Sequence, residues 1–308
     1  MSATVVASRV LPSSGADTVR GIVLITISYF IMTFGDVAVK FALPMAGLTG
    51  AVLFRGVVGS AALLALAGRD GRAGLWRLMP RRWGLVVLRS LLQAFVGIAW
   101  FASWQSMSLA DSYAVGFATP LIATLLAVLF IGERLDWSRV VATLVGFAGV
   151  MIMLRPGSGL WSPALALLLA GVTCSAVTRI LTRQLSRTET PECLAFSLLL
   201  MHVPVGLLLL PFLPIPGLTI EAVLALTLLG LLTGVAQLLN ARAYALAPVS
   251  ALGPFDYSSM LWAVTLGWLC FGEVPNVSAM QGAVVIAIAG LYSFHIERSR
   301  RSRERRIS

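Results

Sequence analysis

The sequence predicts an all-α membrane protein in which ten transmembrane helices form two inverted five-helix repeats. The first observation is composition: 58% of the 308 residues are hydrophobic and 12% are charged, whereas a soluble domain has about 45–50% apolar and about 25% charged residues. The second is that the apolar residues gather into long runs separated by short polar segments. The third is that two stretches, one in each half of the chain, share an ordered set of landmarks.

The apolar runs have the length of membrane-spanning helices. A helix rises about 1.5 Å per residue and the hydrocarbon core is about 30 Å thick, so about 20 residues cross it. We expect helices because lipid cannot satisfy unpaired backbone groups, and because a barrel would show weak alternation in place of long apolar runs. The predicted spans are 21–42, 47–68, 84–107, 110–131, 138–155, 160–183, 193–213, 219–246, 249–271 and 278–296.

The arginines predict the orientation of these spans. If the N-terminus is cytoplasmic, the cytoplasmic segments contain 18 arginines and the outer loops contain only Arg155, as the positive-inside rule requires. An even number of spans returns the C-terminus to the same side. Residues 1–18 lack a signal-peptide core and are expected to be a disordered cytoplasmic leader. Residues 298–308 are expected to be a basic cytoplasmic tail near anionic lipid.

This topology predicts a multi-pass protein of a bacterial-type inner (plasma) membrane. The net charge of +10 could also indicate nucleic-acid binding. However, the basic residues fall in short segments between apolar runs and in the tail, which membrane topology explains better. We therefore expect the lipid bilayer as a partner and no nucleic acid.

The stretches 108–154 and 245–292 indicate an internal repeat. Both open with Leu-Ala and small residues, both reach a Gly-Glu pair at the end of a span, and both continue through an apolar helix that contains glycine. The alternative is a chance match between apolar helices, and the shared order of the landmarks argues against it. The matching landmarks are Gly132-Glu133 with Gly272-Glu273, and Gly149 with Gly290.

We expect the first repeat at 19–156 and the second at 157–297. Because five is an odd number of helices, the second repeat enters the membrane in the opposite direction. The charges agree, since GERLDWSR (132–139) contains two arginines and FGEVPNVS (271–278) contains none. Inverted repeats are typical of secondary transporters, which hold their substrate near the bilayer midplane between the halves.

Each half also contains a helix with proline or aromatic residues that ends in Gly-Glu, FATPLIATLLAVLFIGE (117–133) and PFDYSSMLWAVTLGWLCFGE (254–273). In these segments the chain resembles the drug/metabolite transporter superfamily, in its ten-helix EamA-type branch. The Asp-x-x-x-Lys of the first span, the Phe-Arg-Gly at 54–56 and PFDYSSMLWA are similar to carriers for S-adenosylmethionine uptake. Other carriers of this kind handle amino acids and riboflavin.

The resemblance implies alternating access, no ATP site, and a central cavity lined mainly by the first, third, fourth, sixth, eighth and ninth spans. One departure from symmetry is visible. Met260 stands in the second half near the position that Pro120 occupies in the first, so the two halves need not bend alike.

Charged residues inside the first two spans are the first candidates for function. A charge at mid-bilayer costs at least about 2.5–3.5 kcal/mol on insertion scales, so it should face protein or water and have a partner. Asp36 and Lys40 share one helix face at i and i+4, and Arg55 on the second span reaches about the depth of Asp36. We expect an Asp36–Arg55 pair with Lys40 beside it. This pair either locks the two helices together or serves as an outer gate or a substrate-carboxylate site.

Asp256 is the other acid expected deep in the membrane. Arg89 on the third span and Arg242 on the eighth are its candidate partners. Asp36 and Asp256 are both candidates for proton coupling, and the family resemblance places the ninth span, which contains Asp256, on the cavity. The alternative for each is a satisfied structural pair.

Two helices each carry a polar and aromatic stripe on one face. Alignment of the Leu-Ala landmarks sets Trp100 of the third span against Gln237 of the eighth. Buried amides need hydrogen-bond partners, whereas aromatic stripes are more often packing. The substrate-binding candidates are Gln93, Trp100, Trp104, Gln237, Asn240, Tyr244, Asp256, Tyr257 and Trp262. The gating or coupling candidates are Asp36, Lys40, Arg55, Arg89 and Asp256.

We therefore predict a secondary active transporter of a small polar or zwitterionic metabolite, such as S-adenosylmethionine or an amino acid, working by alternating access with proton coupling or exchange. Cation–π contact from Trp100 or Trp104 would suit an amine or sulfonium group. The alternatives are a flippase for a lipid-linked substrate in the same superfamily and an intramembrane transferase. A transferase would need clustered catalytic groups at one depth, and the acids here are scattered, so we do not expect an enzyme.

No cofactor or metal is expected. The cysteines Cys174, Cys193 and Cys270 lack a CxxC spacing, and His202 and His295 have no companion of the metal-binding type. The expected partners are a small-molecule substrate and the lipid bilayer, and the expected state is a monomer or homodimer.

Overall fold

The computed structural model describes residues 15–116, 162–246 and 258–274, together with short stretches and single positions between 118 and 152 and between 252 and 292. All regular elements in these residues are helices, which confirms the predicted all-helical fold. They are α1 (Gly15–Gly68), α2 (Gly71–Trp76), α3 (Trp83–Ser103), α4 (Leu109–Gly116), α7 (Pro163–Leu185), α8 (Pro191–Leu209), α9 (Ile220–Leu246) and α11 (Ser258–Phe271).

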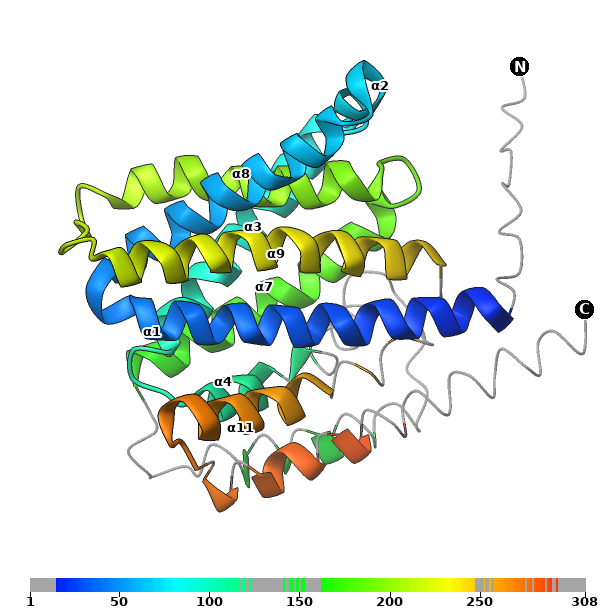
Figure 1. The fold of residues 1–308 in the computed structure, drawn as a ribbon. Coiled ribbons are helices and arrows are strands. Elements are labelled where there is room, and N and C mark those ends of the chain that lie inside the picture. Colours follow the sequence, from blue (N-terminus) through cyan, green and yellow to red (C-terminus); the bar gives the residue numbers. More distant parts are fainter. Residues whose placement is uncertain are drawn as a thin grey trace, which may run out of the picture.

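The helix α1 contains the first two predicted spans, joined at a sharp bend. Gly47 has φ 67° and ψ 177°, a backbone conformation that glycine adopts without steric cost. A Cβ atom at Gly47 would lie 3.1 Å from Cδ of Pro216, in the segment between α8 and α9. The bend therefore lets the chain reverse direction while it packs against that segment, as Figure 1 shows.

Five of the described helical segments are long and apolar enough to cross a membrane. They are Val19–Gly68, Trp83–Ser103, Pro163–Thr182, Pro191–Leu209 and Ile220–Ala243. Large apolar side chains on these helices are exposed, and Leu208 and Leu224 reach 70% and 65%. Lipid rather than water is the natural environment of such a surface.

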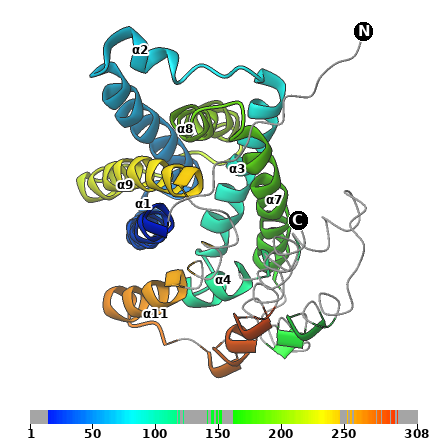
Figure 2. The ribbon, with the colours of Figure 1, turned by 90° about the vertical axis from the view of Figure 1, so that its right-hand side faces the viewer.

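The helix α9 packs along both parts of α1, and α8 packs against the second part (Figure 1). Small residues bring the backbones close together, as is common between membrane helices. A Cβ atom at Gly230 of α9 would lie 2.5 Å from Cβ of Val58, and one at Gly206 of α8 would lie 2.7 Å from Cδ2 of Leu53. In Figure 2, α3 runs between α8 and α7, while α4 and α11 lie together at one side of the bundle.

The turn before α8 is fixed to the segment before α3. The Glu189 carboxylate accepts hydrogen bonds from the backbone N–H groups of Arg81 at 2.9 Å and Arg82 at 2.8 Å. Thr190 caps α8 by accepting from the N–H of Cys193 at 3.1 Å, and its hydroxyl donates to the carbonyl of Arg77 at 2.5 Å. These bonds hold the ends of α3 and α8 in register at one face of the bundle.

The close approach of α9 to α1 predicts that Gly230→Ala destabilises the protein. The added methyl group must push the two helices apart, and overpacking of this kind costs about 1–3 kcal/mol. Thermal unfolding of detergent-purified protein measures the loss. Gly84→Ala is the matched control, because a Cβ atom there meets nothing within 4 Å. Equal melting temperatures for the two variants would contradict the packing described here.

Candidate functional site

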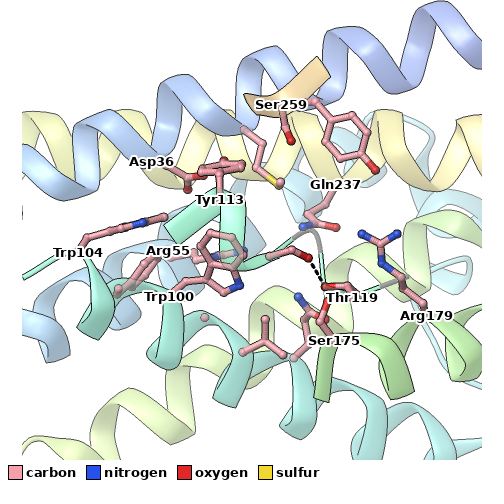
Figure 3. A pocket seen from close by; sticks show the side chains of 17 residues that line it. Asp36, Arg55, Trp100, Trp104, Tyr113, Thr119, Ser175, Arg179, Gln237 and Ser259 are labelled. Atoms are coloured by element: carbon pink, nitrogen blue, oxygen red, sulfur yellow. Dashed lines mark hydrogen bonds between the residues drawn. The ribbon is translucent and has the colours of Figure 1, made fainter. Parts of the chain in front are cut away.

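A cavity of about 900 Å³, part of it open to solvent, lies among the helices. Its wall draws on α1, α3, α4, α7, α9 and α11, which correspond to the first, third, fourth, sixth, eighth and ninth predicted spans, together with Arg55 from the second part of α1. Figure 3 shows its side chains converging from these elements. The lining residues are Tyr29, Met32, Asp36, Arg55, Gln93, Val96, Gly97, Trp100, Phe101, Trp104, Tyr113, Gly116, Thr119, Ser175, Arg179, Gln237 and Ser259.

Asp36 is hydrogen-bonded to α4 rather than paired with an arginine. The hydroxyl of Tyr113 donates to Oδ2 of Asp36 at 2.5 Å. The hydroxyl of Thr33 lies 3.2 Å from that of Tyr113 and donates to the carbonyl of Tyr29 at 2.8 Å. Asp36 is only 7% exposed, so this short chain of hydroxyl groups stabilises a carboxyl group that water barely reaches.

Arg55 lines the same cavity, but the direct Asp36–Arg55 ion pair that we expected is not formed. The two charges interact through space. The Arg55 guanidinium lies over the ring of Phe101, 5.3 Å from its centroid. Its Nε atom is buried without a hydrogen-bond partner. Expectations based on depth alone placed Arg55 next to Asp36, and Tyr113 takes that place.

Lys40 forms its ion pair with a residue other than Asp36. Its ammonium group forms an ion pair with Glu273 and donates to the carbonyl of Met107 at 3.0 Å. The other carboxylate oxygen of Glu273 accepts from the N–H of Leu109 at 3.1 Å, at the start of α4. Lys40 therefore joins α1 to the α3–α4 turn and to the end of α11.

The Gly-Glu landmark of the second half thus has a physical role. Gly272 has φ 66°, which ends α11 in the way that glycine commonly ends a helix. Glu273 follows directly and meets Lys40 across the bundle. Our sequence reasoning noted this pair as a mark of the repeat and did not assign Glu273 to the site.

The three predicted stripe residues of the third span all line the cavity. Gln93, Trp100 and Trp104 all line it, and the Gln93 side-chain oxygen accepts from the hydroxyl of Thr178 at 3.0 Å. The ring of Trp100 packs edge-on against Tyr113, with centroids 5.1 Å apart. These contacts give the cavity a preformed aromatic wall.

The predicted substrate-binding residues on α9 and α11 differ in whether they line the cavity. Gln237 lines the cavity and lies in Figure 3 across from the α3 residues. Asn240 is half-buried and is not among the lining residues of the described chain. Trp262 packs against Phe30 with ring centroids 4.9 Å apart, and it does not line the cavity either. The side chain of Tyr244, and the residues Asp256 and Tyr257, lie outside the described residues.

Arg89 and Arg242, the candidate partners of Asp256, have other contacts. Arg89 donates to Thr182 at 2.7 Å and to the carbonyl of Leu194 at 2.9 Å, so it connects α3 to α7 and α8. Arg242 lies 3.8 Å from the carboxylate of Glu192. Arg89 is therefore placed as a tie between helices, away from the cavity wall.

Several lining residues were missed by our sequence reasoning. Tyr113 and Thr119 come from α4 and the segment after it, and Ser175 and Arg179 come from α7. Arg179 was used only as a mark of orientation. The available signal was that these polar residues fall inside otherwise apolar runs, where each one needs a partner.

The arrangement is suited to binding a flat, polar molecule. Aromatic rings supply apolar faces, the amides of Gln93 and Gln237 supply donors and acceptors, and Arg55 supplies a cation. Small-molecule sites commonly combine aromatic walls with a few polar groups in this way.

Comparison with known proteins finds relatives that are named as transporters. The chain is 37% identical over 237 residues to a riboflavin transporter of Rhizobium johnstonii, covering 75% of this chain and 73% of that protein. It is 34% identical to a riboflavin transporter of Vibrio cholerae, covering 67% of each chain. It is 26% identical to an S-adenosylmethionine uptake transporter of Rickettsia prowazekii, covering 69% of this chain and 72% of that protein.

A solved crystal structure has the same fold, with a TM-score of 0.63 and 18% identity, over 93% of this chain and 99% of the other. The model of the EamA-like transporter family matches residues 19–155 and again residues 162–294. These two stretches contain the described helices that surround the cavity. The chain is a multi-pass membrane protein that belongs to the EamA-like transporter family.

Proposed function

We propose that this protein is a secondary transporter for a flat heteroaromatic metabolite of the riboflavin class. The observation that carries the proposal is the cavity wall, where Trp100, Trp104 and Tyr113 present aromatic rings beside the amides of Gln93 and Gln237. Two relatives more than 30% identical over two thirds of the chain are named riboflavin transporters.

The chemistry of riboflavin matches this wall. A fused three-ring system stacks well on tryptophan and tyrosine, because offset and edge-to-face contacts between aromatic rings are favourable. Its pyrimidinedione edge alternates carbonyl acceptors with an N–H donor, and side-chain amides of Gln93 and Gln237 offer both kinds of group. Its hydroxylated side chain needs further polar partners, and the lining contains the hydroxyl groups of Thr119, Ser175 and Ser259.

A sulfonium or amino-acid substrate of the S-adenosylmethionine kind is the second candidate. The observation in its favour is that the carboxyl group of Asp36 and the rings of Trp100 and Trp104 line one cavity. Aromatic rings attract cations through cation–π contact. Relatives named for S-adenosylmethionine uptake are about 24–26% identical to the chain, below the identity of two of the riboflavin transporters.

Transport in this proposal occurs by alternating access between two inverted repeats, which correspond to the two stretches matched by the family model. With both termini in the cytoplasm, Lys40 lies one helical turn beyond Asp36 toward the outer face. The Lys40–Glu273 ion pair joins the first stretch to the second. We infer that this pair closes the cavity toward the outside and must separate when the outer path opens.

Binding of riboflavin tests the substrate class. An aromatic side chain stacked on the flavin ring quenches its fluorescence, so titration of purified protein into riboflavin is expected to give saturable quenching. Trp100→Ala should weaken binding about 10- to 100-fold through lost stacking and apolar burial. Trp76→Ala is the control, because Trp76 is 70% exposed and outside the cavity. Saturable binding of S-adenosylmethionine without any response to riboflavin would favour the second candidate.

The rate of chemical modification of Lys40 measures how accessible the proposed outer gate is, because Lys40 is the single lysine of the chain. An amine-reactive, membrane-impermeant reagent added to the outer face should modify Lys40 slowly in the wild type and several times faster in Glu273→Gln. Mass spectrometry of the peptide around Lys40 measures the rate. Glu192→Gln is the control, since Glu192 pairs with Arg242 elsewhere.

A moving gate and a fixed strut differ in their response to substrate. If the pair opens during transport, saturating riboflavin should change the rate at which wild-type Lys40 is modified. The idea of a gate is wrong if substrate leaves that rate unchanged while it still binds, or if modification proceeds only from the cytoplasmic face.

A further inference from the structure

The guanidinium of Arg55 lacks the partners that a buried arginine normally has. Arg55 is 8% exposed, and within the described part of the chain no side chain or carbonyl accepts a hydrogen bond from it. Its Nε atom is buried and unpartnered. Burial of a charge is costly unless the charge is paired and hydrogen-bonded, so an arginine kept in this state needs an explanation.

Arg89 shows what a purely structural buried arginine looks like in this protein. It is 7% exposed, almost the same as Arg55, and it donates to Thr182 and to the carbonyl of Leu194. It does not line the cavity, whereas Arg55 does. The two residues are equally buried, but only Arg89 uses its hydrogen bonds to tie helices together.

The surroundings of Arg55 leave room in front of its guanidinium. Gly97 of α3 lines the cavity together with Arg55. A Cβ atom at Gly97 would lie 3.5 Å from Nη1 of Arg55, an ordinary contact, but 2.9 Å from Nε2 of His202, which is too close. Nδ1 of His202 lies 2.8 Å from the carbonyl of Leu198 and must donate to it, since a carbonyl only accepts. Nε2 of the neutral ring is then an acceptor, and it too is buried without a partner.

Asp36 does not remove the need for another partner. Its Oδ2 atom receives the hydroxyl hydrogen of Tyr113, and its charge acts on Arg55 only through space. The negative charge of Asp36 thus helps to stabilise the positive charge of Arg55 in the cavity, while the N–H groups of Arg55 stay free of hydrogen bonds to Asp36. The guanidinium carbon lies over the Phe101 ring, 5.3 Å from its centroid.

We propose that Arg55 anchors the substrate by donating two parallel hydrogen bonds to a planar pair of acceptors on it. Arginine presents its donors as a rigid fork that fits such a pair, and lysine cannot reproduce this geometry. The acceptor pair is either a ring carbonyl with its neighbouring ring nitrogen, as in a flavin, or a carboxylate, as in an amino-acid substrate. This inference rests on the proposed transport function and names the residue that selects the substrate.

Binding measurements with Arg55→Lys test the proposal, because lysine keeps the charge and loses the fork. The probes are riboflavin, lumiflavin, S-adenosylmethionine and its decarboxylated form. Lumiflavin keeps the ring edge and lacks the hydroxylated chain, while the decarboxylated compound lacks the carboxylate. We expect a loss of about 10- to 100-fold in affinity, the size of lost charge-assisted hydrogen bonds. Arg77→Lys, in an exposed loop, should bind like the wild type.

The pattern across the probes identifies the acceptor pair. Equal losses for riboflavin and lumiflavin place Arg55 at the ring edge, and a loss for S-adenosylmethionine that is absent for its decarboxylated form places it at a carboxylate. The proposal is overturned if Arg55→Lys binds every probe like the wild type. It is also overturned if the double variant Asp36→Asn/Arg55→Gln regains wild-type affinity, since Arg55 would then only balance the charge of Asp36.

A second measurement needs no ligand and separates this inference from the proposed function. The substitution is made in Asp36→Asn, so that removal of Arg55 does not leave the Asp36 carboxylate without a nearby cation. The melting temperature of Asp36→Asn/Arg55→Met should then lie within a few degrees of that of Asp36→Asn. Arg89→Met should melt well below the wild type, because it loses two hydrogen bonds between helices. If Arg55→Met loses as much stability as Arg89→Met, Arg55 is a strut and the inference fails. If no probe binds the wild type, the substrate class fails, and this comparison still decides the role of Arg55.

Discussion

Charged side chains inside apolar helices must find partners within the protein, and the partners they find organise this bundle. Arg89 connects α3 to α7 and α8, Lys40 connects α1 to Glu273, and Asp36 is bonded to Tyr113 of α4. Each of these contacts links helices that are distant in the sequence. Arg55 differs, since its guanidinium lines the cavity and donates no hydrogen bond to the described part of the chain. At the cavity, Arg55 therefore lacks the hydrogen-bond partners that Asp36 and Arg89 have.

The cavity also gathers groups from both stretches that match the family model. Trp100 and Tyr113 come from the first stretch, while Gln237 and Ser259 come from the second. A movement of one stretch against the other would change the spacing of these groups. Close packing at Gly230 and Gly206 joins α9 and α8 of the second stretch to the second part of α1 in the first stretch. A site formed by both stretches is the arrangement that alternating access uses, in which the substrate stays in place and the paths to it change.

The sequence was sufficient for the long helices in the described part of the chain and for part of the cavity. Long apolar runs predict membrane spans whichever way each helix is rotated about its axis. The two spans predicted on either side of Gly47 and the predicted bounds of α9 therefore agree closely with the structure. The expected depth in the membrane placed Asp36 near Arg55. It could not show that the hydroxyl of Tyr113 lies close enough to Asp36 to form the hydrogen bond in place of Arg55. Likewise, Asn240 and Trp262 lie on helices of the cavity but outside its wall, because periodicity groups residues on a face without fixing the rotation of the helix. The Lys40–Glu273 contact depends on tertiary packing between the two ends of the chain, which no local pattern encodes.

Counterflow in reconstituted vesicles tests the central claim most directly. Vesicles that contain the purified protein would be loaded with unlabelled riboflavin and diluted into a trace of labelled riboflavin. A carrier that alternates between two accessible states should accumulate label transiently above its equilibrium level, and vesicles without internal riboflavin should take up less. Labelled riboflavin that binds the protein but enters loaded and empty vesicles at the same rate would contradict a carrier built around this cavity.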